Sequence, residues 1–484
     1  MVGVPGRSKA CITCRKRRKG CDLERPTCAQ CRKAGVTCAG YDTQRVFVVS
    51  TPNSRRKGYS APVAPNTSGS LWQRIHRNQA SIDITNFRLL SRPEDERRCI
   101  DLFWEAYFPS GRPIPTSAFR SYTCTWTETA RNFYRDDESL RYALWANCLL
   151  ITGRRHGAVW MLREGSKLYG QALTYLRRSL ELSHGAKRDA LIATVKLLSM
   201  FEAFSQEGDG QRADPSQDWQ RHHSGELALF IARTPVAHVD GDAHHVFADE
   251  RVEMALSAVL RRKQSVLSTP EWKSIPWQEI PKNLKDILVD ILVDMPGLVE
   301  AFDDMKHCTE PSRQAALRLE LVQKCWEQDR QLLTWSGLLF QGVNPGKQPC
   351  TEPRSEDFVT HVAQVHGMSL FWTTSLVLYS ILRMASGPQA DLPERADPMH
   401  HARHLIHAIT ILLQPKAGLY GQQSAALPLE VALQYTRALS SSSRENEALL
   451  NTLKALKDDL GNGLTRMINA SAAHRGIARQ DTEA

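Results

Sequence analysis

The sequence predicts a small metal-stabilised module at the N-terminus, followed by a large all-α domain. Three observations lead to this fold class. Six of the twelve cysteines lie within 28 residues, from Cys11 to Cys38. Residues 1–60 carry 14 lysines and arginines but only three acidic residues. From about residue 96 onward, apolar residues recur at three- and four-residue steps, which is the period of an amphipathic helix.

Composition and charge restrict the class of protein. The chain is 42% hydrophobic and 24% charged, as is usual for a globular protein. Its net charge is +10 and residues 1–60 alone carry +11, so we expect a polyanionic partner for that region only. The N-terminus lacks the apolar segment of a signal peptide, which indicates a cytosolic or nuclear protein with reduced thiols. In that setting, clustered cysteines favour metal binding over disulfides.

The clustered cysteines follow the spacing C-x2-C-x6-C-x6-C-x2-C-x6-C. They are Cys11, Cys14, Cys21, Cys28, Cys31 and Cys38. Because a structural zinc takes four ligands in a tetrahedron, six thiolates serve one zinc with two left over, or two zincs if two sulfurs bridge. The twofold repeat of the pattern matches the second arrangement. The segment has few apolar residues, so metal binding must supply most of its folding free energy, on the order of 10 kcal/mol per zinc.

This segment resembles the binuclear zinc cluster of fungal transcription factors at all six cysteine positions. The resemblance implies two zinc ions and a module with two short helices, in which Cys11 and Cys28 bridge the ions. Cys14 and Cys21 would complete one site, and Cys31 and Cys38 the other. A secreted disulfide knot or a single-zinc site with spare thiols is the alternative, against which the missing signal peptide and the intervening basic residues argue.

An uninterrupted basic run follows the first cysteine pair: Arg15, Lys16, Arg17, Arg18 and Lys19. In the resembling family, a short helix at this place enters the major groove of DNA and reads a CGG triplet through two basic residues in the middle of the run. By position these are Arg17 and Arg18, and the arginine fork suits O6 and N7 of guanine. Phosphate contacts are expected from the remaining basic residues: Arg15, Lys16, Lys19, Arg32 and Lys33. Read alone, the run is a nuclear localisation signal, and the two interpretations are compatible.

Two other positions bear on the resemblance. Pro26 lies in the connector between the two halves, where the family usually has proline, often in a cis turn. Gly20 stands where many members carry lysine or another larger residue. We expect this glycine to remove one phosphate contact without endangering the cluster.

The chain divides into three predicted segments: a zinc cluster over 7–40, a flexible linker over 41–95, and an all-helical regulatory domain over 96–484. The linker is rich in Pro, Ser, Asn and Gly and lacks periodicity. No leucine heptad follows the zinc cluster, so the sequence gives no support to a head-to-head dimer, and monomer and dimer both stay open. Val359–Leu382 has no charged residue, and we expect a buried core helix there rather than a membrane span.

The helical region also resembles, more loosely, the regulatory domain found behind many fungal zinc clusters. The motif runs from His222-His223-Ser224-Gly225 through Leu229 to Arg233-Thr234-Pro235, with Thr234 in place of the usual glycine. We interpret these motifs as structural, with Gly225 allowing close helix packing. A second motif contributes Trp272 and Trp277, which we expect in the core or at an interface.

Two histidine-rich stretches of the sequence do not indicate a second metal site. HVDGDAHH, from His238 to His245, lacks the companion ligands of a metal site, and MHHARHLIHA over 399–408 is interpreted as a solvated amphipathic helix. No nucleophile elbow, phosphate loop or dinucleotide fingerprint is present in the sequence.

The sequence therefore predicts a nuclear, sequence-specific DNA-binding transcription regulator that recognises CGG-type sites, most simply at RNA polymerase II genes in a fungus, and that is not an enzyme. Its expected partners are double-stranded DNA, the transcription machinery or coregulators, and no membrane; a small-molecule effector of the helical domain stays an open alternative. A metabolite-binding or catalytic helical domain with the cluster as a targeting module is the second hypothesis. A scaffold that binds nucleic acid without sequence preference is the third.

Overall fold

The structure of the chain is a computed structural model. It describes residues 11–17, 19–24, 27–39, 93–114, 125–181, 189–205, 215–340, 357–387, 389–438 and 444–459. The chain separates into two compact units, Met1–Ala64 and Pro65–Ala484, which are described one at a time. The predictions for Arg18, for the Pro26 connector and for the linker up to residue 92 lie outside the described residues.

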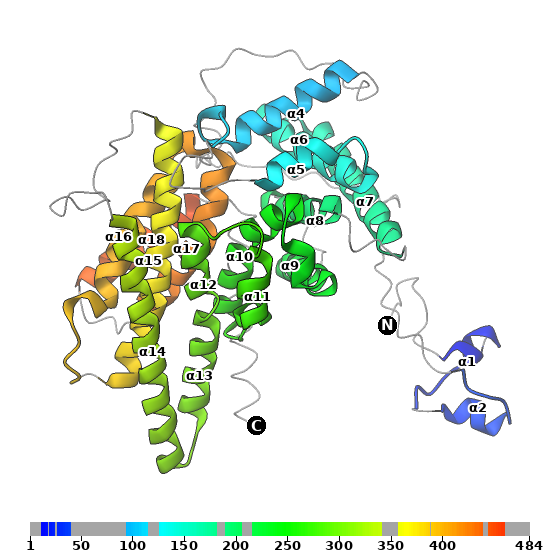
Figure 1. The fold of residues 1–484 in the computed structure, drawn as a ribbon. Helices are drawn as coiled ribbons and strands as arrows, with labels where there is room; N and C mark the ends of the chain where they lie inside the picture. Colours follow the sequence, from blue (N-terminus) through cyan, green and yellow to red (C-terminus); the bar gives the residue numbers. More distant parts are fainter. Residues whose placement is uncertain are drawn as a thin grey trace. The chain divides into compact units, whose positions relative to one another are not determined.

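The first unit contains two five-residue helices, α1 (Ile12–Lys16) and α2 (Ala29–Lys33), drawn in blue in Figure 1. Its described part has no apolar core, because its fully buried side chains are those of Cys11, Cys14, Cys28 and Cys31. This agrees with the expectation that something other than apolar burial must hold the segment together.

The second unit is built from helices, and its described residues include no strand, which confirms the predicted large all-α region. The α-helices are α4 (Pro93–Tyr107), α5 (Thr125–Phe133), α6 (Glu138–His156), α7 (Val159–Glu181), α8 (Asp189–Phe204), α9 (Pro215–Arg233), α10 (Gly241–Arg261), α11 (Pro270–Ser274), α12 (Leu284–Leu292), α13 (Met295–His307), α14 (Pro311–Phe340), α15 (Phe358–Ser386), α16 (Pro398–Leu412), α17 (Gly418–Ala438) and α18 (Arg444–Asp459). Short 3-10 helices connect some of them: η1 (Pro109–Gly111), η4 (Pro235–His238), η5 (Val266–Ser268), η6 (Ile275–Trp277), η7 (Glu394–Ala396) and η8 (Pro415–Ala417).

The N-terminal helices of this unit surround α8. Helices α5, α6, α7 and α9 all contact it, so its residues are buried on almost every side. This explains why DALIATVKLLSMFEAF is apolar around its whole circumference rather than along one stripe. Lys196, the exception in the middle of this helix, is therefore placed in the interior of the unit.

The C-terminal helices pack around α15. Helices α13, α14, α16 and α17 contact it, and Figure 1 shows α14 and α13 running side by side as a long pair. Among the described residues, α15 is the one helix long and apolar enough to cross a membrane, and 72% of its apolar window is buried inside the unit. Its composition is therefore that of a core helix, as the sequence predicts.

A cluster of aromatic rings joins α10 to η4, α11 and η6. Trp272 and Trp277 are buried against Phe247, which confirms that these tryptophans belong to the core. Two histidines of the HVDGDAHH stretch lie in the same cluster. The ring of His238 stacks on Phe247 and its Nδ1 lies 3.2 Å from the Ala243 carbonyl, while Nδ1 of His244 lies 2.8 Å from the Pro276 carbonyl. These histidines thus pack as core residues of a helical unit.

The structure corrects two expectations about the helical region, one for Gly225 and one for the histidines of α16. Gly225 is exposed, and a Cβ built there would meet no atom within 4 Å, so close helix packing does not require this glycine. On α16, His401 is buried at 5% exposure, stacks on Tyr379 and shares a hydrogen bond with the Arg395 carbonyl, so that part of MHHARHLIHA is core rather than solvated. Burial lowers the pKa of His401 to about 4, and this ring is neutral at physiological pH.

Candidate metal centre and nucleic-acid interface

Each CxxC pair starts a helix, and the first cysteine of each pair caps it. The backbone N–H of Cys14 donates to the sulfur of Cys11 at 3.3 Å, and the N–H of Cys31 donates to the sulfur of Cys28 at 3.3 Å. Helix N-termini and backbone N–H groups favour negative charge. The two halves of the segment therefore repeat one local structure, in which a backbone N–H donates to the sulfur of Cys11 and of Cys28.

The six sulfurs converge in two overlapping sets of four. Cys11, Cys14, Cys21 and Cys28 form one set; the other consists of Cys11, Cys28, Cys31 and Cys38, so that Cys11 and Cys28 belong to both. Within each set the sulfurs lie within 4.8 Å of one another, and Cys11 lies 3.6 Å from Cys28. A zinc–sulfur bond of about 2.3 Å gives a tetrahedron whose edges are about 3.8 Å long. The sulfur positions therefore fit two tetrahedral ions that share two ligands.

Disulfide chemistry does not fit these cysteines. The Cys14 sulfur lies 3.6 Å from that of Cys28 and 3.8 Å from that of Cys31, whereas a disulfide bond is about 2.05 Å long. Burial raises the pKa of both Cys14 and Cys28, so a cation beside them would favour their thiolate forms. Zinc ions supply that charge when bound, and their coordination bonds replace a hydrophobic core.

Polar contacts hold the loops that carry the remaining ligands. The carboxylate of Asp22 accepts hydrogen bonds from the backbone N–H groups of Ala29 (3.0 Å) and Gln30 (3.4 Å), at the start of α2. These bonds, that from Ala29 above all, lower the pKa of Asp22. The hydroxyl of Thr13 donates to the Thr37 carbonyl at 3.0 Å and accepts from the Ala39 N–H at 2.9 Å. Asp22 thus fixes the chain next to Cys21, and Thr13 fixes the chain next to Cys38.

The described basic side chains of the run are exposed. Lys16 is the last residue of α1, Arg17 follows it, and Lys19 lies in the loop before Cys21. Arg18 lies outside the described residues, and α1 places the backbone of Arg15 but its side chain is not described. The structure therefore brings three of the five predicted basic residues to the surface at the end of α1, where a polyanion can reach them.

On α2 the two predicted basic residues differ in their surroundings. Lys33 is exposed, whereas Arg32 donates to the carboxylate of Glu24 at 2.7 Å. Sequence reasoning did not anticipate this pair or the role of Asp22. The available signal was that two of the three acidic residues of the basic region fall in the short loop between Cys21 and Cys28.

Comparison with known families agrees with this geometry. Residues 9–46 match the model of the fungal Zn(2)-Cys(6) binuclear cluster domain, a match that includes all six cysteines. No curated protein and no solved structure is significantly similar to the chain. The domain binds two zinc ions and belongs to DNA-binding transcription factors. Residues 9–46 are therefore a fungal binuclear zinc cluster domain, and this domain supports a zinc-dependent DNA-binding regulator.

Proposed function

We propose that the chain is a nuclear transcription regulator that binds CGG-type sites at RNA polymerase II genes. The observation that carries this proposal is the metal-held α1 with its exposed basic end. In this proposal Cys11 and Cys28 bridge two zinc ions, and the other four cysteines fill one position each. The segment over 7–40 is the DNA-binding domain, 41–95 is a linker, and 96–484 is the regulatory domain.

The assignment of DNA contacts follows from position and chemistry. Arg17 and Arg18 read guanines from the major groove, because the guanidinium fork matches O6 and N7. Lys16, Lys19 and Lys33 contact phosphates, which orient the module without reading sequence, and Arg15 is assigned to the same role. Arg32 is the weakest of these assignments, because a phosphate must compete with Glu24 for its guanidinium.

The helical unit is proposed to regulate DNA binding through coregulators or a small-molecule effector. A cavity in the helical unit, lined by charged, polar and apolar side chains, is the observation that favours a ligand, and it equally fits the metabolite-binding alternative. The two roles are separable, because a purely enzymatic domain would turn its ligand over, whereas a regulatory domain would bind it unchanged.

The first test counts zinc and selects DNA together, on the purified full chain. Two zinc ions per chain and enrichment of CGG sites from a random DNA pool are the expected results. Zero or one zinc, or a pool without enrichment, would contradict the proposal and leave the basic run as a localisation or nonspecific binding segment.

Arg17→Ala and Lys33→Ala separate base reading from phosphate contact. Arg17→Ala should cost about 1–3 kcal/mol on the selected site and relax its specificity, whereas Lys33→Ala should weaken binding to all sequences alike. Equal losses on selected and random DNA for both variants would overturn the roles assigned here. The readout is the dissociation constant on both kinds of DNA at one fixed salt concentration.

A further inference from the structure

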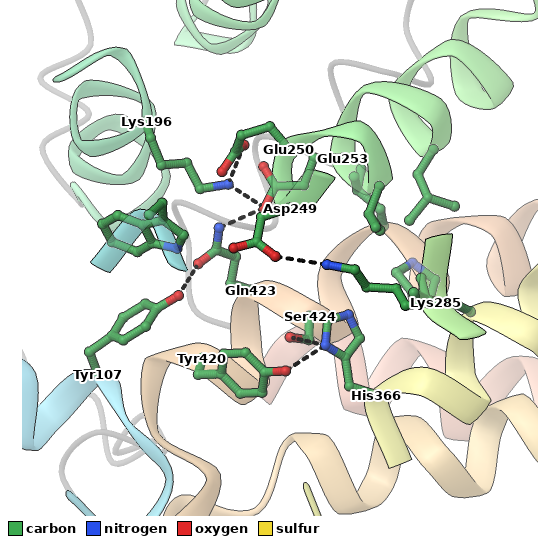
Figure 2. A pocket seen from close by; sticks show the side chains of 16 residues that line it. Tyr107, Lys196, Asp249, Glu250, Glu253, Lys285, His366, Tyr420, Gln423 and Ser424 are labelled. Carbon is green, nitrogen blue, oxygen red and sulfur yellow. Dashed lines mark hydrogen bonds and ion pairs between the residues drawn. The ribbon is translucent and has the colours of Figure 1, made fainter. Parts of the chain in front are cut away.

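The helical unit contains a cavity of about 70 Å³, lined by charged, polar and apolar side chains and shown in Figure 2. Side chains from α4, α5, α8, α10, α12, α15 and α17 line it. One water needs roughly 10–15 Å³ of such space, so the cavity has room for a small chemical group of several atoms. Its position between helices of one unit is a common place for ligand sites.

The base of the cavity is an ion-pair cluster. The ammonium of Lys196 lies 2.8 Å from the carboxylate of Glu250 and 2.6 Å from that of Glu253. The side chains of Lys196 and Glu250 are 4% and 1% exposed, whereas that of Glu253 is 23% exposed and marks the side that solvent reaches. Burial alone would lower the pKa of Lys196, but Glu250 and then Glu253 raise it, so this ammonium stays charged.

The walls carry more carboxyl groups than ammonium groups. Lys285 pairs with Asp249 at 2.8 Å, and the buried Glu226 lies close enough to Glu250 to share a hydrogen bond. Burial and then Lys285 lower the pKa of His366 to about 4, so this lining ring adds no positive charge. In the lining, three carboxyl groups thus face two ammonium groups: Asp249, Glu250 and Glu253 against Lys196 and Lys285, while Glu226 lies beside Glu250 and outside the lining.

Such a cluster is costly as a purely structural element. Each buried ion loses several kcal/mol of hydration, and replacing a buried ion pair by apolar side chains of similar volume is often neutral or stabilising. An unequal number of opposite charges adds to this cost, because the excess must be neutralised inside the protein. A group that enters from solvent with a positive charge would remove the imbalance.

Aromatic side chains line the cavity beside the carboxylates. Tyr107 packs edge-on against Trp126, with ring centroids 5.4 Å apart, and against Tyr420 at 6.3 Å. The hydroxyl of Tyr107 donates to Gln423, whose amide donates in turn to Glu253 at 2.6 Å. Aromatic rings next to carboxylates form the environment that organic cations prefer.

We propose that this cavity is a binding site for the ammonium group of a small organic amine. An anion would face the excess of carboxylates and would have to displace them from both lysines. A neutral alcohol could hydrogen-bond but could not balance the charge. An effect of the amine on DNA binding rests on the proposed regulatory function, whereas its binding to the cavity does not.

Protons compete with such a cation. Burial raises the pKa of Glu250 to about 7, and burial together with Glu250 raises that of Glu226 well above its usual range. In the protein alone, protons on Glu250 and Glu226 therefore neutralise part of the negative charge that the carboxyl groups set against Lys196 and Lys285. An amine must displace a proton from Glu250, so its affinity should rise about tenfold between pH 6 and pH 8.

Calorimetric titration of the full zinc-loaded chain tests the site with three probes of equal chain length: n-butylammonium, 1-butanol and butyrate. We expect binding of butylammonium alone, with proton release and tighter binding at pH 8 than at pH 6. Equal binding of butanol or butyrate, absence of butylammonium binding at both pH values, or affinity that falls with pH would each overturn the proposal.

Two variants that change the charge of the cavity in opposite directions distinguish a loss of amine recognition from general damage to the helical unit. Glu253→Gln removes a negative charge and should weaken butylammonium binding about tenfold, whereas Lys285→Met removes a positive charge and should strengthen it by a similar factor. General damage to the unit would weaken binding in both variants, and that outcome would overturn the assignment. Leu319→Ala, at an exposed position on α14, is the control that should change nothing.

DNA affinity measured with and without butylammonium distinguishes this inference from the proposed function. Amine binding without any DNA binding by the chain would leave the site standing and refute the regulator. Sequence-specific DNA binding by a chain that takes up no amine would do the reverse.

Discussion

The two units of this chain are held together by different forces. In the described part of the cysteine module, the fully buried side chains are four cysteines, whereas the helical unit buries a continuous set of leucine, valine, isoleucine and aromatic side chains. Burial of apolar surface contributes about 25 cal/mol per Å², and a segment with so few apolar residues can obtain little of it. The stability of the first unit therefore depends on metal, and that of the second depends on packing.

The two units also use charge differently. Lys16, Arg17 and Lys33 are exposed and remain available to a partner, whereas Lys196 and Lys285 are buried against carboxylates. Exposed charges attract a polyanion from solution in a salt-dependent way, while buried ones act only on what enters their cavity. The same chain thus has two kinds of electrostatic site: exposed basic residues suited to a polyanion, and a buried charge cluster suited to a small ion.

Removal of zinc should produce the largest effect and the sharpest contrast. Chelation should unfold the cysteine module, because each structural zinc contributes on the order of 10 kcal/mol, and leave the helical unit folded. Cys28→Ala, which removes a sulfur shared by both sets, should lower the zinc content. Cys325→Ala, a buried cysteine of α14, should leave it unchanged. Zinc analysis measures metal binding by the cysteine module, and circular dichroism measures the helix content of the helical unit. Unfolding of both units by a chelator would contradict the claim that only the first unit depends on metal.

Trp335→Ala makes the reciprocal change. This side chain is 1% exposed, stacks on Phe371 and donates its indole N–H to the Leu284 carbonyl at 2.7 Å. Its loss should lower the free energy of unfolding of the helical unit by about 3–5 kcal/mol. Urea unfolding measures this, and zinc content should not change.

Leu319→Ala on the same helix is the matched control. This leucine is 72% exposed, so its truncation should change stability by no more than about 0.5 kcal/mol. Loss of zinc in Trp335→Ala would show that the units stabilise each other, contrary to the comparison.

The contrast also explains what could be predicted from sequence. The ligands of the cysteine module lie within 28 residues and their spacing alone specifies the metal chemistry, so the cluster was recognised and the family match agrees with it. The all-α character of the second unit followed from local helical periodicity. Both features depend on residues that are near each other in the chain.

The features that escaped prediction depend on residues far apart. At the cavity, Tyr107 of α4 donates a hydrogen bond to Gln423 of α17, and no local sequence pattern predicts this contact. Lys196 is a single lysine in an apolar helix, and the local sequence does not reveal its partners because they lie on α10. Similarly, His238 was recognisable as core only once Phe247 and the Ala243 carbonyl were seen beside it.

Thr234→Gly should increase the stability of the helical unit alone. The resemblance noted in the sequence has glycine here, and the structure gives the reason: Thr234 has φ +65° and ψ 159°, a region that is essentially restricted to glycine. Relief of strain worth about 1–3 kcal/mol, less roughly 0.5–1 kcal/mol for the flexibility of glycine, leaves a net gain of about 1 kcal/mol. Thr234→Ala keeps a Cβ and should show no gain. A stability loss on Thr234→Gly, measured by urea unfolding, would mean that this backbone conformation is unstrained.

Gly20→Lys should have the smallest effect, which is limited to DNA binding by the cysteine module. A Cβ at Gly20 meets no atom within 4 Å, and its φ is not among the positive values of the unit, so the module can accept a side chain without losing zinc. Because Gly20 follows the exposed Lys19, an added ammonium should reach one more phosphate. The slope of log affinity against log salt should then steepen by about 0.9, with equal gains on all sequences. Gly20→Gln, uncharged and of similar length, should leave the slope unchanged. An unchanged slope in Gly20→Lys would place the loop from Lys19 to Cys21 away from the phosphate backbone, and would confine the electrostatic contact to the end of α1.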